Sequence, residues 1–277
     1  MTEGDRENEV FFRLLGRKGR MKLDMHCHTK EGSLDGKVSI ADYIAILQRR
    51  GFDGMVVTDH NSYNGYRYWK NHIKGKRYTN FKVFKGVEYD TIDAGHILVI
   101  MPEDVKLKIL EVRGLPVQVL TDLVHKHGGI LGPAHPCGEK YLSVTNTKKY
   151  WFRKNILAKF DFIEEFNACE SEESNRSAAM LAQVYRLAGT GGSDAHKVDC
   201  IGTAYTILEE QVESETELIA YIKARKPMKT GGVYYHGTTK EKLGVAGAVL
   251  TQSFWFYNRF TWLLKTYSRK KTLRSEK

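Results

Sequence analysis

The chain has 277 residues, of which 42% are hydrophobic and 27% charged, the fractions of an ordinary globular protein. It contains no internal repeat or low-complexity tract, which excludes a repeat architecture. The net charge is +10, but residues 1–22 carry +2 and residues 265–277 carry +5, so the body between them is near +3. A near-neutral body does not favour nucleic acid as a partner. Basic tails are typical of solvated termini or of contact with an anionic surface.

The cysteines and the first residues bear on the compartment. Cys27, Cys137, Cys169 and Cys200 show neither a disulfide framework nor a paired CxxC spacing, so we expect reduced thiols. The N-terminal segment opens with acidic residues and has no long apolar stretch, so we expect no signal peptide. Together these features favour a cytoplasmic protein.

Strands and helices are predicted to alternate along the chain. An alternating apolar run predicts a strand over 21–26, and Ser39 and Gly51 mark the start and end of the helix that follows. Residues 61–80 form a polar, aromatic connection. Further strands are predicted at 52–60, 81–90, 95–101, 129–136, 160–168 and in a segment ending at 196. Further helices are predicted at about 116–127 and at 174–189, the second capped by Gly189, and a strand and helix over 202–226 close the compact region.

This order of elements predicts an α/β fold. Strands that alternate with helices favour a mostly parallel sheet with right-handed crossovers. Seven candidate strands through residue 196 favour a barrel, in which chemistry collects at the C-terminal ends of the strands. We divide the chain into an N-terminal tail at 1–20, a barrel at 21–230 and a C-terminal extension at 231–277.

Histidines and carboxylates gather at the predicted strand ends. Residues i and i+2 of a strand project to the same face, so His26 and His28 can both reach one ion. A lone histidine at a strand end is more often a hydrogen-bonded structural residue. The pattern recurs at several strand ends, however, and coincidence explains it poorly; the further members are Asp59, His60, Glu88, His96, His135, Asp194 and His196. Imidazole and carboxylate donors suit Zn, Fe or Mn.

Seven short motifs follow one another within residues 22–207. They are DMHCHT, TDHN, GVE, GHILVI, AHP, IEEFNA and GSDAH. In this order they resemble the successive motifs of the polymerase and histidinol phosphatase (PHP) superfamily. The resemblance implies a distorted (β/α)7 barrel, in agreement with the strand count. The sequence KPMKTGGVYYHG beyond them is similar to a C-terminal extension of some bacterial members.

The resemblance also implies ligands for two or three divalent metal ions, with Zn, Mn and Fe all open. The first set comprises His26, His28, Glu88 and Asp194; the second, Glu88, His96 and His135; and the third, Asp35, His60 and His196. Glu88 would bridge the first two ions. Asp24 and Asp59 are expected to orient neighbouring imidazoles. In the simpler interpretation Asp24 only binds a backbone amide and Asp59 only caps a turn.

Such a cluster favours phosphate ester hydrolysis. Clustered cations lower the pKa of bound water and neutralise phosphoryl oxygens. The hypothesis is in-line attack by a metal-bridging hydroxide on a phosphomonoester, with Glu88 and Asp194 holding the metals and orienting the hydroxide. His196 or His60 would protonate the leaving oxygen.

The substrate is predicted less sharply, and nucleotides and small sugar phosphates both remain open. Basic side chains in loops on the expected rim are candidate phosphate contacts, although basic residues are mostly solvated surface charges. They are Arg67, Lys140, Lys148, Lys149, Arg153 and Arg176. Neighbouring aromatic residues, among them Tyr63 and Trp69, are candidates to stack on a base.

The C-terminal sequence GVAGAVLTQSFWFYNRFTWLLKTYSRKK, residues 244–271, predicts an apolar, aromatic helix followed by a basic run. A helix that is apolar on more than one face is usually buried, which favours docking on the barrel or on a second copy of the chain. The alternative is peripheral contact with a membrane, with the aromatic residues at headgroup depth and the basic run on anionic lipid.

Two other functions stay open. An amidohydrolase-type barrel that cleaves C–N bonds also uses an HxH motif, but such sites often need a bridging lysine where Glu88 stands here. A non-catalytic PHP module that binds nucleic acid is the other alternative. The complete ligand set and the near-neutral body argue against it.

Overall fold

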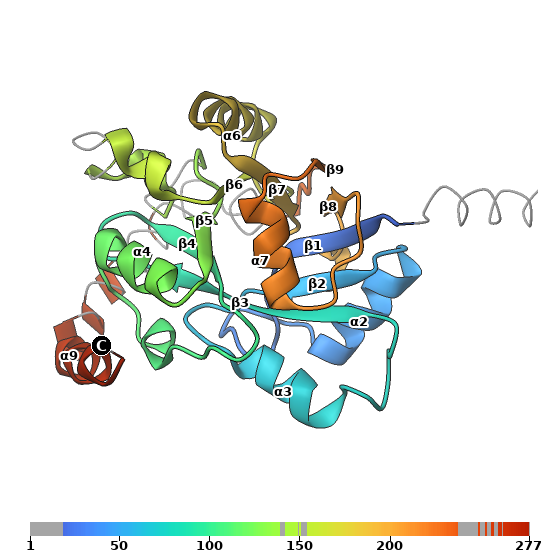
Figure 1. The fold of residues 1–277 in the computed structure, drawn as a ribbon, viewed down its shortest axis with the longest axis horizontal. Coiled ribbons are helices and arrows are strands. Elements are labelled where there is room, and N and C mark those ends of the chain that lie inside the picture. Colours follow the sequence, from blue (N-terminus) through green and yellow to red (C-terminus); the bar gives the residue numbers. More distant parts are fainter. Residues whose placement is uncertain are drawn as a thin grey trace, which may run out of the picture.

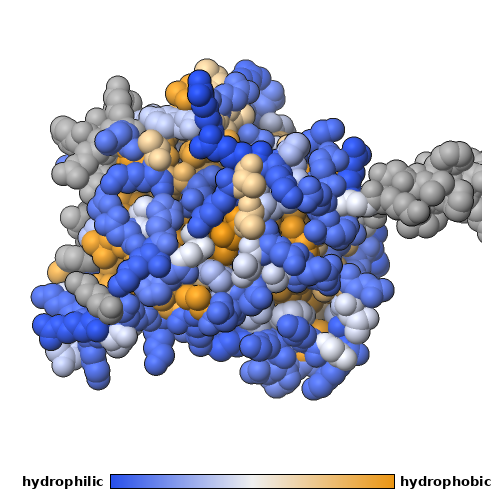
Figure 2. All heavy atoms as spheres, viewed as in Figure 1, coloured by the Kyte–Doolittle hydropathy of each residue, from blue (hydrophilic) through white to orange (hydrophobic). Residues whose placement is uncertain are grey.

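The computed structural model describes residues 19–138, 142–148, 150, 154–237, 249, 253, 256–257, 260–261 and 263–276. Strands curve around the interior and helices lie on the outside (Figure 1), which confirms the α/β class. The face seen in Figure 2 is mostly hydrophilic, with apolar side chains visible only in scattered patches. Among the described residues no helix is both long and apolar enough to cross a membrane.

Nine strands and six α-helices make up the described fold. The strands are β1 Met21–Cys27, β2 Gly54–Val57, β3 Lys82–Asp90, β4 His96–Ile100, β5 Ile130–Pro133, β6 Phe162–Asn167, β7 Ala188–Gly192, β8 Ala204–Leu208 and β9 Met228–Gly232. The α-helices are α2 Ile40–Arg49, α3 Asn64–His72, α4 Val117–Lys126, α6 Glu172–Tyr185, α7 Glu215–Lys223 and α9 Thr266–Ser275. Four 3₁₀ turns join them: η1 Lys108–Glu111, η2 Val144–Asn146, η3 Lys154–Lys159 and η4 Val198–Cys200.

The strands form two sheets with mixed directions. Seven strands lie in the order β5-β4-β3-β2-β1-β8-β9, and β6 pairs with β7 in a separate sheet. Only β1–β2, β2–β3 and β6–β7 are parallel, so the expectation of a mostly parallel sheet is wrong. Strand β4 runs antiparallel to β3 because the link between them is short. A parallel crossover needs a dozen or more residues, and residues 91–95 allow only a turn.

The β3–β4 turn places the start of one strand beside the end of the other. Asp90 pairs with His96 in the antiparallel register. Gly95 has φ +71°, and an added Cβ would lie 2.0 Å from the Leu142 carbonyl oxygen, so the turn requires glycine. His96 therefore reaches the rim formed by the C-terminal ends of β1 to β3, although it begins its strand.

The separate sheet is joined to β1 at its rim end. Gly192 ends β7, and a Cβ there would lie 2.3 Å from the His26 Cβ, so only glycine permits this approach. Asp194 follows with φ 51°, and its backbone N–H donates to the His26 carbonyl at 2.9 Å. The two sheets thus deliver His26 and Asp194 to the same place.

Helix boundaries agree with the sequence where local signals are strong. The Ser39 side chain accepts from the Asp42 backbone N–H, and Gly51 has φ +72° after the helix, as predicted. The prediction that Gly189 caps α6 is wrong, because Arg186 takes the left-handed conformation there and Gly189 lies in β7. Helix α3 lies in the stretch expected to be a connection.

The C-terminal helix α9 docks on the body. The guanidinium of Arg269 is nearly buried and donates to the Arg113 carbonyl at 2.8 Å. Leu273 packs against the core cluster that contains Leu110 and Leu120. The described apolar residues before α9 are instead exposed, among them Phe256, Phe260 and Leu263.

Candidate metal centre

Strand β1 ends with two buried histidines that converge. Met21, Leu23 and Met25 pack into one core cluster, so the alternation of the strand directs His26 to the opposite face. His28 is the first residue after β1, and its Nε2 lies 3.1 Å from His26 Nε2. Neither ring is accessible to solvent.

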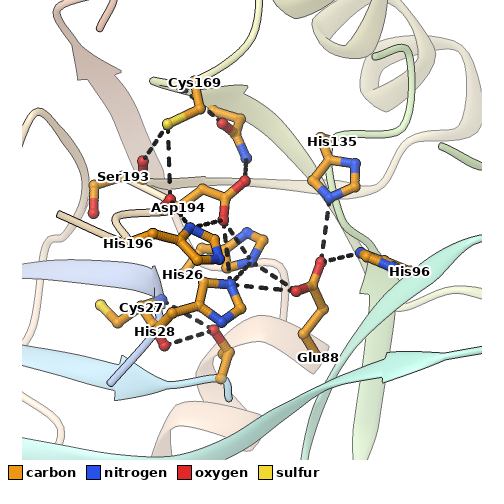
Figure 3. Close-up of polar contacts among 12 residues, drawn as sticks. His26, Cys27, His28, Glu88, His96, His135, Cys169, Ser193, Asp194 and His196 are labelled. Carbon is orange, nitrogen blue, oxygen red and sulfur yellow. Dashed lines mark hydrogen bonds and ion pairs between the residues drawn. The ribbon is translucent and has the colours of Figure 1, made fainter. Parts of the chain in front are cut away.

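Two carboxylates complete a first donor set around these rings (Figure 3). Glu88 Oε2 lies 3.5 Å from His26 Nε2 and 3.3 Å from His28 Nε2. Asp194 Oδ1 lies 3.5 Å and 3.2 Å from the same two atoms. In a tetrahedral zinc site with bonds of about 2.1 Å, adjacent donors are about 3.4 Å apart, so the four atoms are spaced to surround an ion.

A second donor set uses the other oxygen of Glu88. Its Oε1 lies 2.8 Å from His96 Nδ1 and 3.2 Å from His135 Nε2. His135 has φ 31°, a conformation that non-glycine residues rarely adopt outside tightly constrained sites. One carboxylate therefore faces two donor sets at once.

A third donor set lies nearer to solvent. Asp35 Oδ2 is 3.3 Å from His196 Nε2 and 3.8 Å from His60 Nε2. Ring nitrogens of His28, His60 and His196 also lie within 4.8 Å of one another. The Asp35 side chain is 57% exposed, whereas that of Glu88 is 1% exposed, so the cluster runs from a buried end to an open end.

A family model described as PHP-associated matches residues 172–227, from α6 to just beyond α7 and before the extension expected at 231–277. Among solved structures, the fold resembles a two-domain protein containing a predicted PHP-like metal-dependent phosphoesterase from Bacteroides vulgatus. Its TM-score is 0.53 and its identity 16%, over 77% of this chain and 65% of that chain. The family-model match agrees with the resemblance of the sequence motifs to the PHP superfamily.

Two further solved structures are similar to this chain. One is a predicted metal-dependent phosphoesterase from Bifidobacterium adolescentis, with TM-score 0.56 and 13% identity over 74% of this chain and 96% of that chain. The other is a lesion-specific endonuclease from Pyrococcus furiosus, with TM-score 0.59 and 17% identity over 76% of this chain and 57% of that chain. At these identities the likeness concerns the fold alone. No curated protein matches the chain.

The donor chemistry of the cluster fits divalent metal ions. Glu88 Oε2 is buried without a hydrogen-bond partner among the described residues, although three histidines surround it. Burial alone would raise the pKa of the Glu88 carboxyl, but the charges of His96, His60 and His26 outweigh burial and hold the pKa well below its usual range. Such a set of carboxylates and imidazoles can exchange its protons for cations.

One orienting carboxylate was not predicted from the sequence. Glu164 of β6 lies within IEEFNA, and its Oε1 is 2.9 Å from His26 Nδ1. Its Oε2 accepts from the His135 backbone N–H at 2.6 Å and from the Asn167 side chain at 3.0 Å. The alternation of β6 is the one sequence signal that could have separated Glu164 from outward-facing Glu165, whose carboxylate accepts from Thr230.

The two aspartates expected to orient imidazoles act less directly. Asp59 accepts from the Ser33 hydroxyl at 3.0 Å, and the Ser33 oxygen lies 3.1 Å from His28 Nδ1, so a hydroxyl stands between carboxylate and ring. Asp24 accepts from the backbone N–H and hydroxyl of Ser193 at 2.9 Å and 2.5 Å. Asp24 therefore fixes the backbone before Asp194, as the simpler interpretation had it.

The expected phosphate contacts that the structure describes lie away from the donor sets. Arg67 pairs with Glu111 at 2.6 Å and also contacts Asn64, and Arg176 pairs with Glu172 at 2.9 Å on the outer face of α6. Lys148 is exposed. Lys140, Lys149 and Arg153 lie outside the described residues. Tyr63 and Trp69 are buried in the core and so are not placed to stack on a base.

Proposed function

We propose that this protein belongs to the PHP superfamily and is a metal-dependent hydrolase of phosphate esters that acts on small phosphomonoesters. The observation that carries the proposal is Glu88, whose two oxygens face two separate nitrogen-rich donor sets. The first two sets are each spaced to hold one divalent ion, and the third, around Asp35, would hold an additional ion. The donor types suit Zn, Mn or Fe.

When bound, the ions would lower the pKa of a water molecule and neutralise the phosphoryl oxygens. The protein's own residues set the geometry. Asp194 is held by its backbone bond to His26, so its carboxylate stays directed at the first donor set. His196 Nδ1 lies 2.9 Å from the Asp194 carbonyl, which leaves Nε2 facing Asp35 and the open end of the cluster.

The open end is the place for the substrate. His60 and His196 are partly exposed there, whereas His26 and His28 are fully buried, so we expect an ester to approach from the side of the third set. Where the third set holds no ion, His196 or His60 would donate a proton to the leaving oxygen. A nucleotide or a sugar phosphate fits this scheme, since either presents one terminal phosphate.

The test is phosphate release from a panel of nucleotides and sugar phosphates after reconstitution with Mn, Fe or Zn. Glu88→Gln should lose more than the roughly 10- to 100-fold that an outer partner typically costs, because it removes a donor from two sets. The exposed Glu103 provides the control, and Glu103→Gln should behave as wild type.

Full activity in Glu88→Gln would refute the bridging role. Hydrolysis of a model diester but of no monoester would favour a phosphodiesterase, the kind of activity that the structurally similar endonuclease has. Silence on all esters, with metal bound, would refute the phosphoesterase and leave the amidohydrolase and binding alternatives.

A further inference from the structure

Asp90 lies between two of the proposed donor sets, and with His60 and His96 it forms a further group of possible ligands within 4.8 Å of one another. It is buried at the end of β3, and its Oδ1 lies 3.2 Å from His96 Nε2 and 3.7 Å from His60 Nδ1. His96 belongs to the second set and His60 to the third. Asp90 thus faces one histidine of each set, two residues beyond Glu88 on the same strand.

In both histidines the nitrogen that faces Asp90 is not the one that serves its set. His96 directs Nδ1 at Glu88 Oε1, at 2.8 Å, and leaves Nε2 to Asp90. His60 directs Nε2 at Asp35, at 3.8 Å, and its Nδ1 lies 3.0 Å from Glu88 Oε2 and 3.7 Å from Asp90 Oδ1. A histidine that binds a metal through one nitrogen keeps its proton on the other, and a carboxylate commonly accepts that N–H.

The second oxygen of Asp90 is fixed by a buried arginine. Asp90 Oδ2 forms an ion pair with the Arg113 guanidinium, whose side chain is 12% exposed. Within the described part of the chain, Asp90 Oδ1 and His96 Nε2 are buried without a hydrogen-bond partner despite lying 3.2 Å apart. The arrangement leaves one oxygen committed to Arg113 and the other directed at the two rings.

We infer that Asp90, held by Arg113, is a positioning residue shared by the second and third donor sets. It accepts the ring proton of His96 and of His60 and so fixes which nitrogen of each is presented to an ion. Arg113 prevents Asp90 from turning toward the ions itself. The inference deepens the proposed function, since it takes the donor sets to hold divalent ions.

The test measures metal affinity, which is independent of any substrate. Mn²⁺ and Zn²⁺ binding to the full chain would be titrated against a chelator, for wild type, Asp90→Asn and Arg113→Gln. Both variants should bind the wild-type number of ions at saturation, with about 10- to 100-fold weaker affinity for the ions beyond the first. Asp161→Asn is the matched control, because Asp161 contacts His125 at 2.9 Å outside the donor sets, and it should match wild type.

A Co²⁺ absorption spectrum separates a positioning residue from a ligand. Under saturating Co²⁺ the Asp90→Asn spectrum should equal that of wild type, because the donor atoms are unchanged. A missing ion or an altered spectrum at saturation would make Asp90 a ligand and overturn the inference. Unchanged affinity in Asp90→Asn would overturn it as well.

Folding is checked by thermal unfolding of the metal-free proteins. If Asp90→Asn does not fold, Arg113→Lys takes its place, since lysine keeps the charge but not the two-pronged geometry. It should weaken binding less than Arg113→Gln, and equal affinity in wild type and both Arg113 variants would refute the inference. A wild type that binds ions yet hydrolyses no ester refutes the proposed function while leaving the inference standing.

Discussion

Glu164 is the side chain that contacts the ring of His26, one of the two fully buried histidines. Its two oxygens contact the His26 ring and the His135 backbone, which belong to different donor sets. Residue types at strand ends predicted that His26 and His135 lie on one rim, and the centroids of their rings are 6.0 Å apart. Glu164 lies 138 residues from His26, so its contact follows only from the folded chain.

Glu164→Gln is expected to weaken metal binding by about 10- to 100-fold, because an amide is a poorer acceptor for the His26 ring proton and can present its NH₂ to a ring nitrogen. Chelator competition with Zn²⁺ would measure the change. Glu165→Gln is the control, since the adjacent carboxylate contacts Thr230 on the other side of β6. Equal affinity in the two variants would contradict the assignment of Glu164.

At the scale of elements, the site depends on how closely β7 approaches β1. A Cβ on Gly192 would lie 2.6 Å from the His26 backbone nitrogen, where no flexible atom can give way. Gly189 is the second residue of the same strand, and the three atoms nearest to a Cβ there all belong to the Glu165 carboxylate, the far end of a flexible side chain. The two glycines thus differ in what an added methyl group would displace.

Gly192→Ala is expected to lower the free energy of unfolding by about 1–3 kcal/mol, because the strands must separate to admit the methyl group. Gly189→Ala should cost clearly less. Urea unfolding of both metal-free variants would measure the difference. The close approach of β7 to β1 would be refuted by a Gly192→Ala variant as stable as Gly189→Ala.

At the scale of the whole molecule, the C-terminal segment is divided between docking and exposure. Helix α9 docks through Arg269 and Leu273, but it contains the basic run, whereas the expectation of docking concerned the apolar segment before it. Phe256 and Phe260, each 61% exposed, do not follow that expectation. An apolar surface beside a basic helix is typical of contact with anionic lipid, and a second copy of the chain is the other partner expected from the sequence.

The membrane expectation is tested by co-sedimentation with vesicles. Wild type should sediment with phosphatidylserine-containing vesicles at low salt and not with phosphatidylcholine alone. The triple variant Phe256→Ser, Phe260→Ser and Leu263→Ser should lose this binding, whereas Val184→Ser, which removes an exposed apolar side chain of α6, should keep it. Equal sedimentation of all three proteins would end the membrane idea, and a wild-type dimer that the triple variant abolishes would identify a second copy instead.

The sequence by itself determined the donor types and most element positions. His26 and His28 share a face because a strand repeats every two residues, and Ser39 and Gly51 bound a helix through contacts within a few residues. Strand periodicity and helix-capping residues are local signals, so they can be recognised in the sequence without the tertiary structure. They also predicted eight of the nine proposed ligands at the ends of strands, whereas Asp35 was implied only by the family resemblance.

The tertiary structure decided the strand directions and the partners of the ligands. The five residues between β3 and β4 turn His96 back beside Asp90, which the alternation of strands and helices did not reveal. The roles of Asp90, Arg113 and Glu164 arise only when distant segments meet. Their charged and hydrogen-bonding partners are neighbours in the folded chain and not in the sequence. Arg67 likewise meets Glu111, 44 residues away, only in the folded chain, whereas Arg176 pairs with Glu172 one turn away on its own helix.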